Sequence, residues 1–448
     1  MSCMVVSHDR EGRQSSIIIL KRFTIIARND THTPPAGTIC SLLEVDVNPL
    51  RCRSPMQLLT IGRIMSSVPA SGFTGVKRLS IFGKRRKRKT MKNLCNMSLD
   101  QLRDLVTGLG EPAYRAEQVW QWVWDKGVQR IEEMTNLSKD LRTKLAQAGE
   151  IRWPEIAEIL VSSDTTVKFM LRLDDGALVE TVLIPERTHT TQCLSTQVGC
   201  AMGCSFCSTG DMGFTRNMTM AEILGQVLVA RQYLKDQGRE IKELRNLVFM
   251  GMGEPLLNLD ELMRSLAVLN SETGLGFSSR RITVSTVGVL KGLEVLGDSG
   301  LAMLAVSLHA PTQQLREQIM PTAAKAVPLD ELMPVLDRYP LRPRQRITYE
   351  YIMLKGVNDK PEHAKGLVRL LGQRKAKVNL IAYNAGPDAP YQAPARMEIL
   401  TFEKILHVKG LTATIRSSKG QDISAACGQL KADYIRRQLE GCDQKDTK

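Results

Sequence analysis

Three cysteines in one short loop constrain this chain more than any other feature of its sequence. Cys200, Cys204 and Cys207 are spaced C-x3-C-x2-C and directly follow an extended segment. Thiolates at this spacing can converge on three irons of a four-iron, four-sulfur cube and leave the fourth iron without a protein ligand. Cys193 lies seven residues upstream of Cys200, so four cysteines could instead close a zinc tetrahedron. The cysteines alone leave both sites open.

A glycine-rich turn favours the cluster over zinc. Residues 246–255 form an apolar run, NLVFMGMGEP, that ends in Gly251, Gly253, Glu254 and Pro255. This turn resembles the Gly-Gly-Glu-Pro motif with which radical S-adenosylmethionine (SAM) enzymes hold the amino group of SAM. A zinc ribbon does not require such a turn. The resemblance implies a redox cluster whose open iron holds SAM and passes it an electron.

Strands and helices alternate from Gln192 onward. Thr219 with Glu222 forms a capping box at the start of one helix, and Asn258 with Glu261 is expected to open the next in the same way. Six strands that alternate with helices indicate parallel pairing and right-handed crossovers. We therefore predict an α/β fold, an incomplete (βα)6 radical-SAM barrel whose open side can admit a macromolecule and whose site lies at the C-terminal strand ends. The expected strands are residues 192–199, 246–252, 281–287, 302–308, 347–354 and 377–383.

Two smaller elements precede this barrel. Residues 98–150 show helical periodicity, and we interpret the aromatic stripe containing Trp120 and Trp124 as core. Residues 156–185 alternate as strands do, with a hairpin turn at 174–176. Glu180 lies inside the second hairpin strand, where the pattern allows either a solvent-facing side chain or one near a catalytic centre.

These patterns divide the chain into five parts. We expect a basic leader at 1–90, a helical accessory domain at 91–152, a β-hairpin extension at 153–190, the partial barrel with its Cys427 loop at 191–440 and a tail at 441–448.

The positive charge of the chain belongs mostly to the leader. Residues 1–90 carry 16 Lys or Arg against 5 Asp or Glu, a net charge of +11 out of +14. Readable patterning begins near Met91, so the leader is interpreted as an over-extended start, with a basic RNA-contacting arm or an organellar presequence as alternatives. A chain that begins at Met91 is expected to fold and act. No apolar run has the length of a membrane span, and ten cysteines without an export signal favour the cytoplasm.

Four motifs together resemble one family. The segments at 193–207, 250–258, 307–311 and 426–430 are similar to those of the bacterial dual-specificity RNA adenine-C2 methyltransferases of the RlmN type, which are radical-SAM enzymes. The similarity runs from about residue 95 to residue 440. It implies one [4Fe-4S] cluster and two SAM molecules per turnover. It also implies 23S rRNA near the peptidyl-transferase centre and tRNA beside the anticodon as substrates, an electron donor such as flavodoxin, a monomer, and no membrane.

The same resemblance assigns roles to individual residues. Cys200, Cys204 and Cys207 would hold the cluster. Cys427 would be methylated and deliver the methyl group to RNA, Cys193 would resolve the covalent intermediate, and either Glu180 or Cys193 would remove the C2 proton. The residues expected to contact SAM from successive strand ends are Gly253, Glu254, Ser285, Ser307, Leu308, His309 and Asn384.

The chemistry explains why a sulfur tether is needed. Adenine C2 is electrophilic and has no nucleophilic lone pair, so direct displacement on SAM fails. The resemblance implies that one SAM methylates Cys427, and that a second is cleaved to a radical that takes hydrogen from the S-methyl group. The methylene radical adds to C2, and attack of Cys193 on Cys427 then releases methyladenosine and leaves a disulfide, which a reductant restores.

Two other functions stay open on the sequence. A related family of antibiotic-resistance enzymes uses the same cysteines to methylate adenine C8, and the cluster and SAM motifs do not separate the two. A zinc-stabilised RNA-binding module without catalysis is the other alternative, although it does not explain the strand-end motifs or Cys427.

Overall fold

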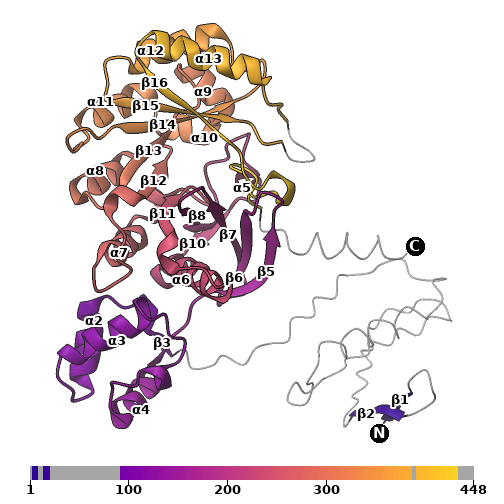
Figure 1. Cartoon of the computed structure of the whole chain (residues 1–448), viewed down its shortest axis with the longest axis vertical. Helices are drawn as coiled ribbons and strands as arrows, with labels where there is room; N and C mark the ends of the chain where they lie inside the picture. Colours follow the sequence, from indigo (N-terminus) through magenta and orange to yellow (C-terminus); the bar gives the residue numbers. More distant parts are fainter. Residues whose placement is uncertain (1–2, 9–13, 21–90, 386–389, 432–448) are drawn as a thin grey trace, which may run out of the picture. The chain divides into compact units, whose positions relative to one another are not determined.

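The computed structural model describes residues 3–8, 14–20, 91–385 and 390–431 (Figure 1). The chain divides into two compact units, Met1–Arg85 and Arg86–Lys448. In the first unit, β1 (Cys3–His8) and β2 (Gln14–Leu20) form an antiparallel pair that the sequence analysis did not predict. The rest of the proposed leader, including its basic run, lies outside the described residues, as do the whole of the proposed tail and the end of the proposed barrel segment.

A small helical module opens the second unit. It contains α2 (Leu99–Gly108), α3 (Tyr114–Trp124) and α4 (Lys139–Ala148). Ser98 caps α2 through a capping box with Gln101, because its hydroxyl satisfies a backbone N–H that the first helical turn leaves free. Trp120 and Trp124 are buried, with ring centroids 5.8 Å apart, which confirms that the aromatic stripe is core.

One ten-stranded mixed sheet forms the body of the molecule (Figure 1). Its strand order is β16-β15-β14-β13-β12-β11-β8-β7-β6-β5. Strands from β8 to β16 run parallel, whereas β5, β6 and β7 continue the sheet antiparallel from β8. The strands are β5 (Glu155–Val161), β6 (Val167–Arg172), β7 (Leu178–Pro185), β8 (Thr190–Cys193), β11 (Leu244–Phe249), β12 (Ile282–Thr286), β13 (Met303–Ser307), β14 (Ile347–Met353), β15 (Ala376–Ala382) and β16 (Thr412–Arg416).

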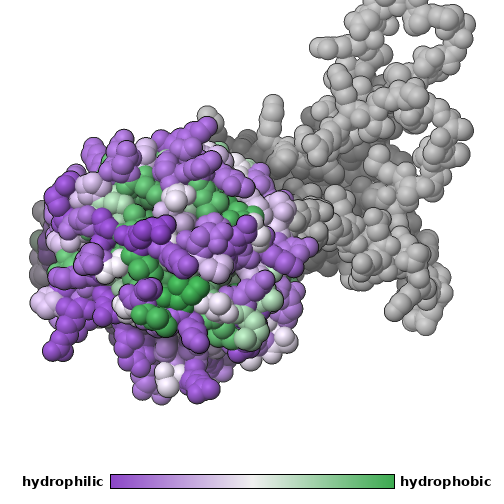
Figure 2. Space-filling model, turned by 90° about the horizontal axis from the view of Figure 1, so that it is seen from above, coloured by the Kyte–Doolittle hydropathy of each residue, from purple (hydrophilic) through white to green (hydrophobic). Residues whose placement is uncertain are grey.

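Helices connect the parallel strands, as the right-handed crossover rule requires. They are α6 (Met220–Asp236), α7 (Leu259–Asn270), α8 (Leu290–Ser299), α9 (Gln313–Ile319), α10 (Pro321–Ala326), α11 (Leu329–Arg338), α12 (Pro361–Leu371) and α13 (Arg396–Val408). The predicted capping box of Thr219 and Glu222 begins α6. On the face seen in Figure 2, apolar side chains lie between polar ones. Met397 and Val408 of α13 are among the exposed apolar residues of the chain.

Three expectations about local structure are corrected. The predicted strand at 192–199 is divided into β8 and β9 (Gln197–Gly199), and β9 pairs with β10 (Phe214–Asn217) outside the main sheet. A seventh parallel strand, β16, was not predicted. Asn258 does not cap α7, because its side-chain amide donates to the carbonyls of Thr196 and Met218 at 2.9 and 2.8 Å.

No helix within the described ranges is long and apolar enough to cross a membrane.

Candidate active site

The cysteine loop follows β9 and is shaped by backbone contacts. Cys200 donates its N–H to the carbonyl of Gly213 at 2.9 Å, and Cys207 donates to the carbonyl of Cys204 at 3.0 Å. Gly199 has a φ of +77°, and a Cβ there would lie 1.8 Å from the carbonyl oxygen of Gly213. Only glycine fits this turn, because a side chain would meet both a steric and a conformational barrier.

The loop is also fixed from outside. Ser205 donates both its N–H and its hydroxyl to the carbonyl of Ile319 at the end of α9, each at 3.0 Å. Ser208 donates its N–H to the carbonyl of Gly428 at 2.8 Å, beside Cys427. The cysteine loop therefore joins two segments that lie more than 100 and more than 200 residues away in the sequence.

The three thiols lie in a desolvated environment. Burial raises the pKa of Cys200 to about 11, and burial likewise raises the pKa values of Cys204 and Cys207. Iron must therefore displace protons when it binds. The three cysteines come from one loop of eight residues, which suits a cluster in which each cysteine binds its own iron.

The glycine-rich turn lies at the C-terminal end of β11. Gly253 has a φ of +99°, and a Cβ there would come within 2.5 Å of the Gln197 side chain. Glu254 is buried, and its carboxylate accepts hydrogen bonds from the Thr286 hydroxyl at 2.6 Å and the Val287 N–H at 2.9 Å. Its carboxyl thus joins the turn after β11 to the end of β12.

Four other expected SAM contacts lie in or directly after the neighbouring strands β12 and β13. Ser285 is in β12 and Ser307 is the last residue of β13. His309 has a positive φ of 56°, and its ring Nδ1 accepts the Ile352 N–H at 3.0 Å. Burial, together with the charge of Arg316, lowers the pKa of His309 to about 3, so the ring is neutral. Leu308 beside it is fully buried.

Asn384, the remaining expected contact, follows β15 and points to the C-terminal loop. Its amide donates to the Cys427 carbonyl at 3.2 Å and accepts from the Gln421 side chain at 2.7 Å. Asn384 thereby links the barrel to the loop that carries Cys427.

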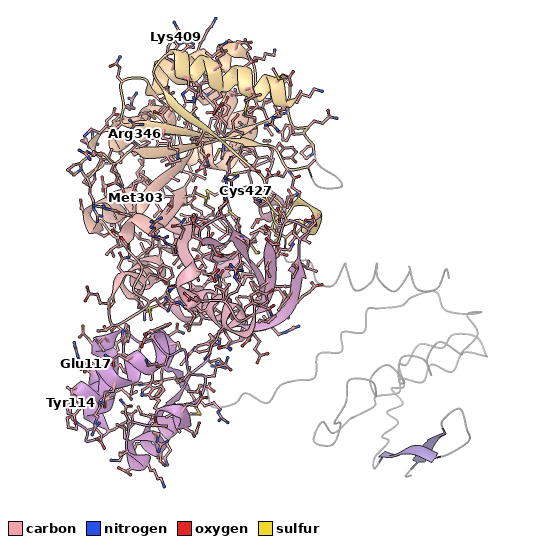
Figure 3. The ribbon with its side chains drawn as sticks, in the orientation of Figure 1. Tyr114, Glu117, Met303, Arg346, Lys409 and Cys427 are labelled. Carbon is pink, nitrogen blue, oxygen red and sulfur yellow. The ribbon has the colours of Figure 1, made fainter. Side chains whose placement is uncertain are left out.

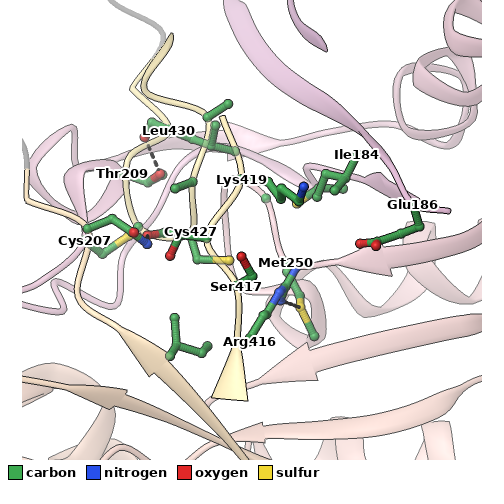
Figure 4. Close-up of a pocket in the computed structure, with 18 residues that line it drawn as sticks. Ile184, Glu186, Cys207, Thr209, Met250, Arg416, Ser417, Lys419, Cys427 and Leu430 are labelled. Atoms are coloured by element: carbon green, nitrogen blue, oxygen red, sulfur yellow. Dashed lines mark hydrogen bonds between the residues drawn. The ribbon is translucent and has the colours of Figure 1, made fainter. Parts of the chain in front are cut away.

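Cys193 and Cys427 line one cavity of about 250 Å³ (Figure 4). Cys207 of the cysteine loop lines it too, as do Gly251 and Asn384. The cavity therefore brings both isolated cysteines next to Cys207 of the expected cluster loop and next to two strand ends, those followed by Gly251 and Asn384. Figure 3 shows Cys427 in the part of the chain that contains the sheet, whereas Tyr114 and Glu117 lie in the helical module at the other end of the view.

Sequence reasoning missed Arg416, a charged residue of this cavity. It ends β16 and lies beside Met250, with its Nη1 3.6 Å from the methionine sulfur. Burial raises the pKa of Cys193 to about 12, and the guanidinium of Arg416 opposes that rise. The sequence signal was weak, because β16 was not predicted and an arginine near a chain end is ordinarily solvated.

Glu180 is fully buried but does not belong to the described lining of that cavity. One carboxylate oxygen lies 3.1 Å from Lys168 Nζ, and the other accepts the Lys431 N–H at 2.8 Å. Strand β7 instead contributes Ile184 to the cavity, and the adjoining Glu186 also lines it. The role of Glu180 as a proton acceptor stays a prediction.

Two family models match this sequence. Residues 92–151 match the ribosomal RNA large subunit methyltransferase N-terminal domain, and residues 194–368 match the radical SAM superfamily. A crystal structure of a radical SAM methyltransferase from Sphaerobacter thermophilus is similar, with a TM-score of 0.72 and 41% identity over 76% of this chain and 99% of that one. The predicted radical-SAM fold is confirmed.

Curated relatives agree with both models. A dual-specificity RNA methyltransferase RlmN from Nitratidesulfovibrio vulgaris (strain DSM 19637 / Miyazaki F) is 61% identical over 77% of this chain and 95% of that protein. The corresponding enzyme of Solidesulfovibrio magneticus is 59% identical over 77% and 97%. A fold, a three-cysteine loop and relatives matched over nearly their whole length together show that this chain belongs to the RlmN family of radical-SAM dual-specificity RNA methyltransferases.

Proposed function

We propose that this chain methylates C2 of adenosine in 23S rRNA and in tRNA, with Cys427 as the carrier of the methyl group. The observation that supports this most directly is the cavity shared by Cys193, Cys427 and Cys207. It joins a sulfur that could carry carbon, a second sulfur that could displace it, and the loop expected to hold the cluster.

The residues present fit the two cofactors. Cys200, Cys204 and Cys207 would hold the cluster, and Gly253, Glu254, Ser285, Ser307, Leu308, His309 and Asn384 would surround SAM. When bound, the cluster and SAM supply the methyl group and the one-electron chemistry that activates it.

Cys427 would serve as a tether between protein and RNA. Asn384 holds its carbonyl, so the thiol is presented from a fixed loop. After the carbon joins adenine C2, the RNA is linked to Cys427 through a C–S bond and the adduct carries one unpaired electron. Loss of the C2 proton together with that electron restores the aromatic ring. Either Glu180 or Cys193 would accept the proton, and the electron would return to the cluster when that is bound.

Cys193 would release the product. Its sulfur attacks the Cys427 sulfur, an S–S bond forms, and the C–S bond breaks as the carbon gains a proton and leaves as the methyl group. Cys193 must lose its own proton for this step, and Arg416 favours the thiolate. A two-electron reductant then restores both thiols.

The finer partners are part of the same proposal. We infer an electron donor such as flavodoxin, a monomeric enzyme and a cytoplasmic location, in line with the cysteine usage of the chain.

Nucleoside mass spectrometry tests the proposed reaction. A strain that lacks its own enzyme would be complemented with this chain, and 2-methyladenosine would be measured in rRNA and tRNA. We expect the product in both pools. Formation of 8-methyladenosine alone would assign the C8 reaction, and product in rRNA alone would remove the dual specificity.

A second test addresses the two cysteines. In Cys193→Ala, a covalent protein–RNA adduct should accumulate, because nothing displaces Cys427 from the carbon. Normal turnover of this variant without an adduct contradicts the resolving role. Stoichiometric zinc without iron in anaerobically prepared protein would point to a binding module.

A further inference from the structure

The Cys427 loop is fastened at both ends to a buried ion pair. Lys168 of β6 and Glu180 of β7 have side chains that are 1% and 0% exposed, with Nζ and Oε1 3.1 Å apart. Lys168 donates to the carbonyl of Ser424 at 3.0 Å, and Glu180 accepts the N–H of Lys431 at 2.8 Å. These two contacts lie three residues before and four residues after Cys427.

Sheet register explains how the pair meets. Met170 lies opposite Glu180 in the antiparallel pairing of β6 and β7, so Lys168 lies two residues along on the same face. Such diagonal neighbours are within reach of a long side chain. Val182, also on this face, lies opposite Cys193 of β8. The ion pair and Cys193 therefore share one face of the sheet, and the Cys427 loop lies over it.

Further bonds define the path of the loop between these anchors. The Thr209 hydroxyl donates to the Leu430 carbonyl at 2.6 Å, and the Asn384 amide donates to the Cys427 carbonyl. The Lys168–Glu180 pair is the charged part of this network and is fully removed from water. A buried ion pair adds little stability compared with apolar residues, but loss of one partner strands the other charge. Such a pair is well suited to specify one geometry.

We propose that Glu180 and Lys168 form a clamp that positions Cys427 against Cys193, and that Glu180 acts through this clamp instead of contacting the RNA base. The proposal rests on the function proposed above and deepens it. The carboxylate oxygens of Glu180 already bind Lys168 and the Lys431 N–H, and Glu180 is absent from the described cavity lining. The hairpin of β6 and β7 sets the position of Glu180, and Glu180 influences the reaction by holding the Cys427 loop in place.

Amide hydrogen exchange of the purified, cluster-loaded enzyme tests the clamp without RNA and without turnover. E180Q removes the carboxylate that pairs with the Lys168 ammonium. K168M removes the ammonium that pairs with the Glu180 carboxylate. In both variants we expect exchange of amides 424–431 to rise on the order of tenfold or more, while the hairpin amides of β6 and β7 stay protected. Alkylation of Cys427 should accelerate in parallel.

The double variant K168M/E180Q separates positioning from proton transfer. It leaves no stranded charge, and the side-chain oxygen introduced at 180 can still accept the Lys431 N–H. Positioning predicts that methyl transfer and the protection of the amides near Lys431 return to within about tenfold of the wild type, although the bond to the Ser424 carbonyl is lost, whereas E180Q alone falls about 100-fold. A proton-acceptor role predicts that the double variant is as inactive as E180Q, because the carboxylate is still missing.

Arg231→Met is the matched control. Arg231 is another largely buried cation that donates to a carbonyl, that of Leu275, and it lies over the Phe277 ring away from the loop. Its loss should leave exchange at 424–431 unchanged, and iron content should equal that of the wild type in every variant.

Two results overturn the clamp. Wild-type exchange at 424–431 in both single variants means that the pair does not hold the loop. If the single variants do not fold, an inactive double variant with a protected loop assigns Glu180 to the substrate. A third result separates the clamp from the proposed function. If the substitutions increase exchange at 424–431 but neither the wild type nor any variant forms methyladenosine, the clamp is supported and the proposed reaction is contradicted.

Discussion

The two cysteine-bearing loops of this protein are built in opposite ways. The cluster loop takes its three cysteines from residues 200–207 and obtains its turns from nearby glycines and backbone bonds, and its contacts with remote segments are made to the backbone carbonyls of Ile319 and Gly428. The Cys427 loop contributes one cysteine and is held by side chains from remote parts of the chain, including Lys168, Glu180 and Asn384. The expected cluster site needs several ligands close together, which a local motif supplies, whereas the proposed methyl carrier needs one atom directed at distant partners.

This difference predicts different failures when each loop is damaged. Changes in the cluster loop should remove iron, and changes around the Cys427 loop should leave iron in place and impair transfer.

The largest effect is expected when a single cysteine of either loop is removed. Cys204→Ala and Cys427→Ala should each lower methyl transfer by about 1000-fold or more, because each removes an essential group. Iron analysis separates them: Cys204→Ala should lose the cluster, and Cys427→Ala should retain it. Equal iron loss in both variants would mean that the two loops are not independent.

Glycine geometry should produce the next largest effect, on stability. Gly199→Ala places a Cβ 1.8 Å from a carbonyl oxygen in a backbone with positive φ, and should destabilise the fold by about 3 kcal/mol or more. Gly176→Ala is the matched control, since its φ of +88° carries the conformational strain but its Cβ would meet nothing within 4 Å. It should cost only about 1 kcal/mol. Denaturant unfolding measures both, and similar losses would contradict the steric argument.

Removal of the Arg416 charge should slow one step. Without the guanidinium, the pKa of Cys193 rises further above its value of about 12 and the thiolate fraction at a given pH falls. In the Arg416→Gln variant the protein–RNA adduct should therefore decay about tenfold more slowly, and the decay rate should recover in part at higher pH. Arg416→Lys should be milder because it keeps the charge. Quenched-flow measurement of adduct decay is the test, and an unchanged decay rate in Arg416→Gln would exclude the assigned role.

The smallest effect concerns the outer attachment of the Cys427 loop to the turn between β5 and β6. Burial opposes ionisation of Asp164, but hydrogen bonds from Thr166 and the Gly420 N–H lower its pKa to about 2. An unfolded aspartate has a pKa of about 3.9, so this contribution is complete above about pH 4 and is lost as the pH falls towards 2.

Asp164→Ala tests this attachment. The substitution should lower the free energy of unfolding by about 1 kcal/mol at pH 7. It should also make that free energy depend less on pH between about pH 4 and pH 2. Exchange at amide 420 should increase while Cys427 alkylation changes little, because the Lys168–Glu180 pair lies closer to the cysteine. An acid limb identical to that of the wild type would show that Asp164 carries no linked proton.

The sequence by itself determined the local part of this protein. The cysteine spacing, the motif at 251–255 and the capping box of α6 are each read from residues within about ten positions. Local hydrogen bonding fixes the form of the capping box, whereas the turn at 251–255 is completed by contacts with Gln197 and Thr286. The alternation of strands and helices likewise predicted the barrel, since parallel strands require crossovers.

Tertiary structure decided what lies between distant segments. The pattern of β6, with Val167, Phe169 and Leu171 alternating with Lys168, is that of a strand with one solvated face, yet Lys168 is buried because the Cys427 loop covers that face. Asn258 reads as a helix cap but binds two carbonyls from other segments, and Arg416 enters the cavity only because β16 joins the sheet edge. Burial and charge pairing at these positions depend on contacts between residues tens to hundreds of positions apart, which local sequence patterns do not encode.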